Sequence, residues 1–182
     1  MGTESALVLE ATIPLRFVAF SDGERPKSRA LDNNLKVFQA CDILDERPSA
    51  DRVDLDLPVA LELKRLDLKM SLMLELMMDL LRQGDRTATE VQVELDFRGV
   101  AWTPANGDLS VGQRGIVELF VHEGLPRPLK FTGSIVAMDA VRSRVRFEFD
   151  GLDETESDQL ERLIFKRHRR KVADIRGLKR SV

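Results

Sequence analysis

The sequence predicts a mostly β protein with added α-helices: a small antiparallel β-barrel, preceded by a pair of helices and followed by a C-terminal helix. Three observations predict this class. Apolar residues recur at helical spacing between residues 29 and 83. After Gly84 the apolar period falls to two, and turn-forming residues separate several short strands. Residues 153–170 begin with acids and end with bases, as the dipole of a helix prefers.

The composition of the 182 residues is that of an ordinary globular protein, with 43% hydrophobic and 32% charged residues. Cys41 is the single cysteine, which excludes an intramolecular disulfide framework and suits a reducing compartment. The first thirty residues lack the basic-then-apolar order of a signal peptide, and the sequence has no run of 18 uncharged apolar residues. We therefore expect a cytoplasmic protein without a membrane span.

Two segments precede the most regular part of the chain. Residues 6–20 are apolar and rich in strand formers, and Pro14 within them suggests an edge strand or a bulge. Residues 29–47 have a helical pattern that Pro48 would end. The apolar stripe of this helix consists of Leu31, Leu35, Val37, Phe38, Cys41 and Leu44.

A second helix is expected from Pro58, a suitable first-turn residue, to Gln83, with Gly84 as its C-terminal cap. It carries a heptad seam with spacings of 4, 3, 4, 3, 4 and 3 residues. The seam residues are Val59, Leu63, Leu66, Met70, Met73, Met77 and Leu80. Further leucines and a methionine between residues 72 and 81 lie outside the seam, so this half of the helix must be covered on several sides.

The heptad helix has two interpretations. One is that it packs on the core of its own domain, as most apolar stripes do. From residue 58 to residue 83, however, the helix would be roughly 40 Å long, longer than a domain built from the rest of the chain can easily cover. We therefore expect a homo-oligomer in which the helices of residues 30–83 form a bundle between subunits. Apolar surface outside the seam favours a tetramer over a dimer.

The C-terminal half predicts a barrel closed by a helix. The candidate strands are residues 90–96, 98–103, 115–121, 129–138 and 144–149. The helix that follows has an apolar face of Leu160, Leu163 and Ile164. Residues 162–182 carry a net charge of +8, leaving −11 on the rest of the chain. This basic end is either an interaction arm or a solvated helix terminus whose cations suit the dipole.

Several stretches of the second half, taken in order, resemble the PilZ domain family. They are "VQVELDFRGVAW", "LSVGQRGIVELFV", "LKFTGSIVAMD" and "VRFEFDGLDETESDQLERLIF". The resemblance implies a six-stranded antiparallel barrel, a fold that commonly binds the bacterial second messenger cyclic di-GMP. It divides the chain into a first strand and loop (1–28), a helical insertion (29–84), the barrel with its closing helix (85–170) and a basic tail (171–182).

The family binds its ligand with two motifs, and the first is not found where the family has it. An Arg-x-x-x-Arg pair should precede the first strand, but the first arginine of this chain is Arg16. Guanidinium groups suit bidentate contact with phosphate, which explains the residue type. Arg82 and Arg86 have the right spacing at the end of the inserted helix, as do Arg142 and Arg146 elsewhere.

The second motif, Asp/Asn-x-Ser-x-x-Gly, falls on residues 94–99. Gly99 matches, and we expect it to adopt a positive φ at the bend. Glu94 takes the Asp/Asn position and Asp96 the serine position, while Arg98 is an offsetting cation or a partner of either carboxylate. A carboxylate cannot donate to phosphate. Two carboxylates on one strand face would each repel a doubly anionic ligand by roughly 3 kcal/mol at 5 Å and a dielectric near 20.

The function expected from these features is that of a non-enzymatic bacterial signalling or adaptor protein. It would act through contacts with an unidentified protein partner in motility, type IV pili or virulence, and would need no cofactor. The alternative is a genuine cyclic di-GMP receptor in which Arg82 and Arg86, or the basic tail, supply the missing arginines. No nucleophile–base pair or Cys/His cluster indicates an enzyme or a metal site. We expect no nucleic-acid role, because Phe165 alone could stack near the basic tail.

Overall fold

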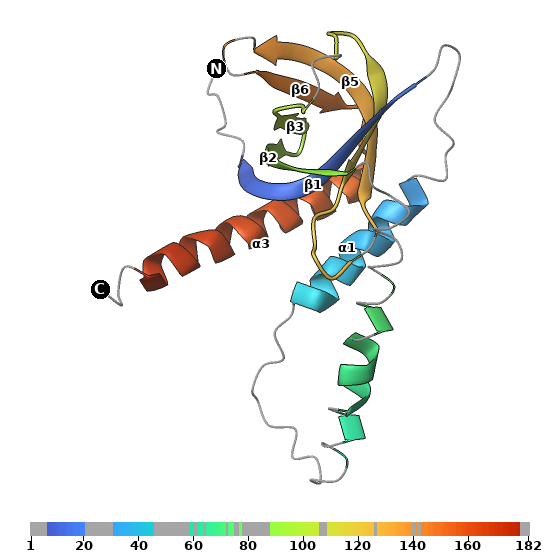
Figure 1. Cartoon of the computed structure of the whole chain (residues 1–182), viewed down its shortest axis with the longest axis vertical. Coiled ribbons are helices and arrows are strands. Elements are labelled where there is room, and N and C mark those ends of the chain that lie inside the picture. Colours follow the sequence, from blue (N-terminus) through green and yellow to red (C-terminus); the bar gives the residue numbers. More distant parts are fainter. Residues whose placement is uncertain are drawn as a thin grey trace.

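The protein folds as a closed six-stranded antiparallel barrel flanked by helices (Figure 1). The computed structural model describes residues 7–20, 31–45, 59, 62–63, 65–71, 73–74, 77, 88–105, 109–125, 127–139, 141 and 143–178. The strands are β1 (Leu9–Ala19), β2 (Thr89–Asp96), β3 (Gly99–Trp102), β4 (Arg114–Leu119), β5 (Leu129–Asp139) and β6 (Arg144–Phe149). They close in the order β1-β2-β3-β6-β5-β4. The first strand expected within residues 6–20 and the five strands predicted after Gly84 are confirmed.

Alternate residues of each strand fill the barrel, which is what period two requires of a sheet with one buried face. In β2, Val93 and Leu95 have no exposed surface, whereas their neighbours Glu94 and Asp96 are half-buried on the outside. Phe17, Trp102 and Phe147 form an aromatic cluster with ring centroids 5.7–6.5 Å apart. The barrel interior is therefore a packed core rather than a channel.

Pro14 lies where β1 changes partners. Residues 9–15 of β1 pair with β2, and residues 15–19 pair with β4. The carbonyl of Pro14 accepts a hydrogen bond from the Phe120 amide, 3.0 Å away, just beyond the end of β4. The expected edge strand is therefore wrong, because the barrel is closed and β1 has a neighbour on each side; Pro14 is accommodated beside the point where the β4 ladder begins at Leu15.

Two helices cover the barrel. Helix α1 (Leu31–Asp45) packs on β5 and α3, and α3 (Glu154–Leu178) packs on β1 and β2. The predicted apolar face of α3 is buried, as are Val37, Phe38 and Cys41 of α1. Leu44, by contrast, is 42% exposed and was wrongly placed in the stripe. Helix α3 also runs past residue 170, where the basic tail was expected to begin, and continues to Leu178.

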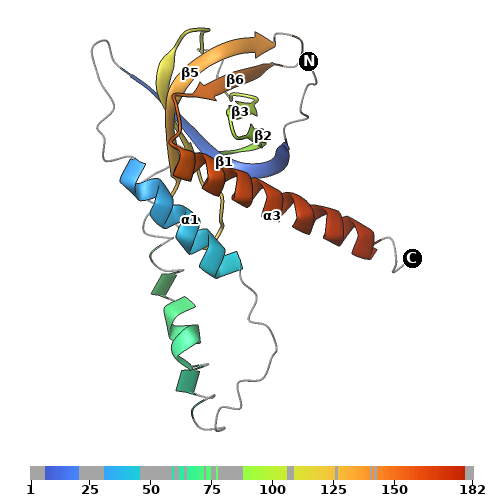
Figure 2. The same ribbon diagram turned by 180° about the vertical axis from the view of Figure 1, so that it is seen from behind.

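The heptad segment, defined as residues 59–80, differs from α1 and α3. Its described residues are helical, and Figures 1 and 2 show them apart from the barrel, beyond α1. All six described seam residues are exposed: Val59, Leu63, Leu66, Met70, Met73 and Met77. Leu80 and the expected caps at Pro58, Gln83 and Gly84 lie outside the described residues. On α1, by contrast, Val37, Phe38 and Cys41 are buried within the subunit.

Gly99 is required for a reason other than the expected one. Its φ is not positive; among the described glycines that conformation occurs at Gly112, with φ 86°. A Cβ added at Gly99 would instead lie 2.1 Å from the carbonyl oxygen of Phe147 on β6. A glycine is needed because the backbones of β3 and β6 approach each other closely, not because the chain bends.

Candidate functional site

The candidate site is the β2–β3 hairpin and the strand that flanks it. Phe97 and Arg98 form the turn between Asp96 and Gly99. One carboxylate oxygen of Asp96 accepts hydrogen bonds from the backbone N–H groups of Arg98, at 2.8 Å, and Gly99, at 3.0 Å. An aspartate at the first position of a turn commonly closes it in this way. Asp96 therefore closes the hairpin turn, and a serine hydroxyl at this position would form weaker hydrogen bonds to the same N–H groups.

Two arginines of β6 pair with the acidic residues of β2. The guanidinium of Arg146 donates to both carboxylate oxygens of Asp96 at 2.8 Å. Arg144 donates to Glu94 at 2.5 Å. Both arginines reach across β3, which lies between β2 and β6 in the barrel. They can do so because β3 presents small residues, Gly99 and Ala101, in the rows that face these strands.

The predicted site residues are thus only partly brought together. Glu94 and Asp96 lie on the same outer face, as expected. The Arg98 side chain does not pair with the carboxylate of Glu94 or Asp96. It is exposed, and its guanidinium lies 5.1 Å from the centroid of the Phe97 ring. Arg82 and Arg86 lie outside the described residues.

The electrostatics of this face differ from the sequence-based expectation. That expectation treated the two carboxylates as unpaired charges repelling an anion, but each of them is neutralised by an arginine. Arg144 was missed, and Arg146 was noted only for its spacing from Arg142, because their carboxylate partners are 50 residues away in the chain. Arg144 and Arg146 lie on one face of their strand with the same spacing of two residues as Glu94 and Asp96. This matched spacing predicts the ion pairs only once the strand order is known.

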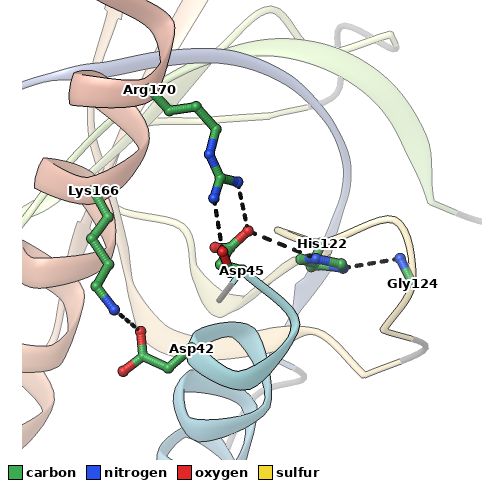
Figure 3. Close-up of polar contacts among 6 residues, drawn as sticks. All are labelled: Asp42, Asp45, His122, Gly124, Lys166 and Arg170. Atoms are coloured by element: carbon green, nitrogen blue, oxygen red, sulfur yellow. Dashed lines mark hydrogen bonds and ion pairs between the residues drawn. The ribbon is translucent and has the colours of Figure 1, made fainter. Parts of the chain in front are cut away.

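A second polar cluster joins α1, α3 and the loop between β4 and β5 (Figure 3). Lys166 donates to Asp42 at 2.5 Å, and Arg170 donates to Asp45 at 2.8 Å. His122 Nε2 lies 3.9 Å from the Asp45 carboxylate. These contacts fix the last turn of α1 to α3, immediately before the chain leaves for the heptad segment.

The tautomer of His122 follows from its contacts. Its Nδ1 accepts a hydrogen bond from the Gly124 N–H at 3.0 Å, so the neutral ring carries its proton on Nε2, facing Asp45. Burial lowers the pKa of His122, while Asp45 acts in the opposite direction. The ring is therefore neutral near pH 7 and serves as a structural acceptor.

Cys41 shows no nucleophilic character. It is fully buried on α1 beside this cluster, and burial raises the pKa of its thiol despite the nearby Arg167. The protonated thiol packs as a small apolar side chain, as expected from its helix position.

The part of the chain that the structure describes holds no group of three or more side chains that could bind a metal ion. None of the described helices combines the length and the apolar character needed to cross a bilayer. A hollow of about 520 Å³ lies between β1, β2 and the segment after β3. Its described wall is formed mainly by apolar side chains, among them Leu15, Phe17, Val91, Trp102 and Leu109. Arg16 is the one cation among the described residues that line it, so they form no cluster of cations for a phosphate.

Six antiparallel strands closed in this order, with a C-terminal helix across the barrel, define a PilZ-type domain. Residues 38–177 match the sequence profile of a family described as "atypical PilZ domain, cyclic di-GMP receptor". The chain belongs to this atypical PilZ domain family. The resemblance expected from the sequence is confirmed.

One solved structure similar to this chain is that of a pathogenic protein from Xanthomonas campestris. It is described as a new tetrameric PilZ domain self-assembled via an unusual helical bundle. The two chains are 26% identical, the TM-score is 0.70, and the match covers 94% of this chain and 93% of that one. A comparison with curated proteins gave no match.

Proposed function

We propose that the protein is an oligomeric, non-enzymatic adaptor of bacterial signalling whose PilZ-type domain does not bind cyclic di-GMP in the usual way. It would act through protein contacts in the cytoplasm, in motility, type IV pili or virulence. The observation that carries this proposal is the state of Asp96, the residue at the serine position of the family's second motif. Its carboxylate already accepts four hydrogen bonds.

The contacts of Asp96 leave little for a ligand. Two of them close the β2–β3 turn, and two hold Arg146. A phosphate that approached this face would have to take Arg146 from a bidentate carboxylate partner, and Arg144 from Glu94. Charge-assisted pairs of this geometry are among the stronger hydrogen bonds of proteins. The obstacle to binding is therefore the internal pairing of the arginines rather than repulsion by bare carboxylates.

Self-association through the heptad segment is the second part of the proposal. Six seam residues at heptad spacing are each about half exposed or more, from 47% for Leu66 to 64% for Met70. Contiguous exposed apolar surface of this kind marks an interaction site in a soluble protein. The Xanthomonas structure, similar to this chain over nearly all of its length, is a tetramer assembled via a helical bundle. This supports a tetramer held by the heptad segments, in which the partner of each seam is another copy.

Calorimetric titration with cyclic di-GMP tests the first part. We expect no saturable binding to the wild-type protein at micromolar concentrations. A stoichiometric, sub-micromolar isotherm would overturn the proposal.

A double substitution sharpens this experiment. Glu94→Asn with Asp96→Ser restores the residue types of the family motif and releases both arginines of β6. We expect measurable binding in this variant and none in the wild type. The matched control is Glu148→Gln, which removes a carboxylate from the exposed face of β6 in the row that contains Gly99. If the control gained as much affinity as the double variant, the pairing of the arginines would not be the obstacle.

The second candidate function is that of a cyclic di-GMP receptor. The description of the matched family and the two arginines beside the turn favour it. In this case the wild-type protein binds the dinucleotide, and charge reversal at Arg146 or Arg98 abolishes binding. Binding that survived both reversals would direct attention to Arg82 and Arg86, the pair with the family spacing.

A further inference from the structure

The hollow between β1, β2 and the segment after β3 lies along one edge of β1. Its described lining includes every residue of β1 from 15 to 19, so the hollow follows the backbone of this strand and not only one row of side chains. Thr89 and Val91 of β2 and Trp102 of β3 also line it, and no described residue of β4 does. The hollow therefore lies on the side of β1 away from β4. We call it the β1 hollow.

The direction of the backbone hydrogen bonds alternates along this part of β1. The Phe20 N–H donates to the Arg114 carbonyl at 3.0 Å, and the Pro14 carbonyl accepts from the Phe120 N–H at 3.0 Å. In an antiparallel ladder, the backbone groups of successive residues point to opposite sides. The groups of the even-numbered residues from 14 to 20 thus face β4, and those of residues 15, 17 and 19 face the side of β2.

Strand β2 begins too late to pair with all of these odd-numbered residues. The ladder between β1 and β2 ends at the pair of Leu15 and Thr89, and Ala88, directly before β2, is not part of a strand. Among the described residues, no strand pairs with Phe17 or Ala19 on this side. Their backbone N–H and C=O groups therefore border the β1 hollow. Ala19 is also exposed, so solvent reaches this edge.

The chemistry of the β1 hollow is apolar and without a free charge. Phe17, Val91 and Trp102 present apolar surface from the barrel. Arg16 is the one ionisable residue of the described lining, and its Nε donates to the Glu118 carboxylate at 2.6 Å. A volume of about 520 Å³ lies within the range of ligand-binding pockets. An occupant should therefore be uncharged and apolar on the side that faces the barrel.

We propose that the β1 hollow receives an extended, uncharged segment of a partner protein, which adds to β1 as a further strand. The backbone of this segment pairs with Phe17 and Ala19. Residues that pair across two strands share one face of a sheet, so the side chains beside Phe17 point towards Trp102 and are apolar. The inference rests on the proposed adaptor function, for which it names the docking surface and the kind of partner.

The backbone groups at the edge favour a peptide over other apolar molecules. An acyl chain in the β1 hollow would cover the N–H and C=O groups of Phe17 and Ala19 without a hydrogen bond, which costs free energy. The backbone of an extended peptide supplies a donor and an acceptor at the spacing of these groups. A nucleotide would find no free cation among the described lining residues.

Fluorescence polarisation with labelled, capped peptides provides the first test. In these probes threonine alternates with apolar residues, and the central residue is valine, leucine, phenylalanine or tryptophan. We expect saturable micromolar binding of at least one probe to the full-length protein, because pairing through the backbone tolerates sequence changes. Failure of all four would overturn the proposal.

N-methylation of the probes separates backbone pairing from apolar contact. The N–H groups of the apolar residues face β1 in the proposed pairing, and those of the threonines face away. Methylation of the apolar residues should weaken binding by about tenfold or more, as expected for the loss of hydrogen bonds. Methylation of the threonines should have little effect. Equal binding of the two analogues would show that the hollow takes apolar groups without adding a strand, and the proposal would be wrong.

Two substitutions test the location. Ala19→Pro removes an N–H group that faces the β1 hollow, and Ala105→Trp fills the hollow from an exposed position outside the strands. Each should weaken binding by about tenfold or more. The matched control is Val111→Trp, in the same segment between β3 and β4, which is 59% exposed and does not line the hollow. Unchanged binding by Ala105→Trp would contradict the site. A changed oligomeric state of this variant would make a second copy the occupant instead.

Hydrogen exchange gives a test within one molecule. The amides of Phe17 and Ala19 should exchange faster than those of Arg16 and Val18, which face β4, and the bound probe should protect only the first pair. No protection by the probe would overturn the pairing. These results are independent of the titration with cyclic di-GMP. A protein that bound the dinucleotide would contradict the proposed function and leave the peptide result intact, and failure of the peptides would leave the titration unaffected.

Discussion

The barrel and the heptad segment are both rich in apolar residues, but these side chains are buried in the barrel and exposed in the heptad segment. In the barrel, Val93, Leu119 and Ile135 have no exposed surface. In the heptad segment, Leu63 is 49% exposed and Met73 is 60% exposed. The same class of side chain is therefore completely covered in one region and largely uncovered in the other.

The difference arises from what each pattern can cover by itself. A period of two gives a strand one apolar face, and six strands closed into a barrel bury all such faces against each other. A heptad seam gives one apolar line along a rod, which needs other helices to cover it. Within the subunit, α1 and α3 already use their apolar faces on the barrel and on each other. The barrel is thus complete within one chain, whereas the described seam residues of the heptad segment stay exposed in the single subunit and are covered only in the proposed tetramer.

Substitutions in the seam should have the largest effect, because they disrupt the assembly of the heptad segments and leave the barrel folded. Met70→Glu with Met77→Glu would bury unpaired charge in every helix contact of the bundle. We expect complete loss of the tetramer in sedimentation equilibrium, giving monomers or insoluble protein. The barrel should keep its near-ultraviolet circular dichroism in the soluble fraction, because neither methionine contacts its core.

Leu68→Glu is the matched control. Leu68 is 71% exposed on the same helix but lies outside the heptad positions. The tetramer should persist in this variant. A wild-type protein that is monomeric at micromolar concentrations would contradict the bundle directly.

The fold could be predicted from the sequence to a large extent because its signals are local. The strands, the buried face at Leu160, Leu163 and Ile164, and the seam all follow from residue spacing. The site could not be predicted as well. Glu94 and Asp96 were found through the motif, but their partners Arg144 and Arg146 depend on β6 lying beside β3, a non-local pairing. The role of Gly99 was misjudged for the same reason, since the backbone that excludes a Cβ belongs to β6.

Gly99→Ala tests the close approach of the backbones of β3 and β6 in the barrel. The added methyl group would lie 2.1 Å from the Phe147 carbonyl oxygen, so the backbones of β3 and β6 must separate. We expect a loss of about 3 kcal/mol in the free energy of unfolding, measured by urea denaturation. The oligomeric state should not change, because the seam is remote from β3. Gly151→Ala, with open space around its Cβ, should leave stability nearly unaltered.

Asn34→Ala tests how α1 completes the barrel. Lys130 of β5 lies beyond the part of the strand that pairs with β6, and the Asn34 side chain takes the place of that partner. Its amide accepts from the Lys130 N–H at 2.8 Å and donates to the Lys130 carbonyl at 2.9 Å. Removing the amide takes a partner from two part-buried backbone groups of Lys130 and from the buried Glu156 carboxylate, 3.2 Å away, for a loss of about 2 kcal/mol. The exposed Gln39→Ala on the same helix gives the baseline in thermal unfolding.

His122→Asn should have the smallest effect, visible in the dependence of stability on pH. The pKa of His122 is lowered by burial below its ordinary value of 6.5, so the unfolded chain binds this proton more readily than the folded one. Its contribution to stability is therefore present above pH 6.5 and is lost as the pH falls from there towards the folded pKa.

Protonation would also place a donor at Nδ1, where the Gly124 N–H now donates, and bring a cation close to Arg167 and Arg170. The favourable charge of Asp45 offsets only part of this. We expect the wild type to lose more stability than His122→Asn between pH 7 and pH 5, followed by urea denaturation at each pH. The opposite contribution of Glu156, whose pKa is raised by burial, is the same in both proteins and cancels in the difference. If the free energy of unfolding had the same pH dependence in both proteins, protonation of His122 would not affect the stability of the α1–α3 junction.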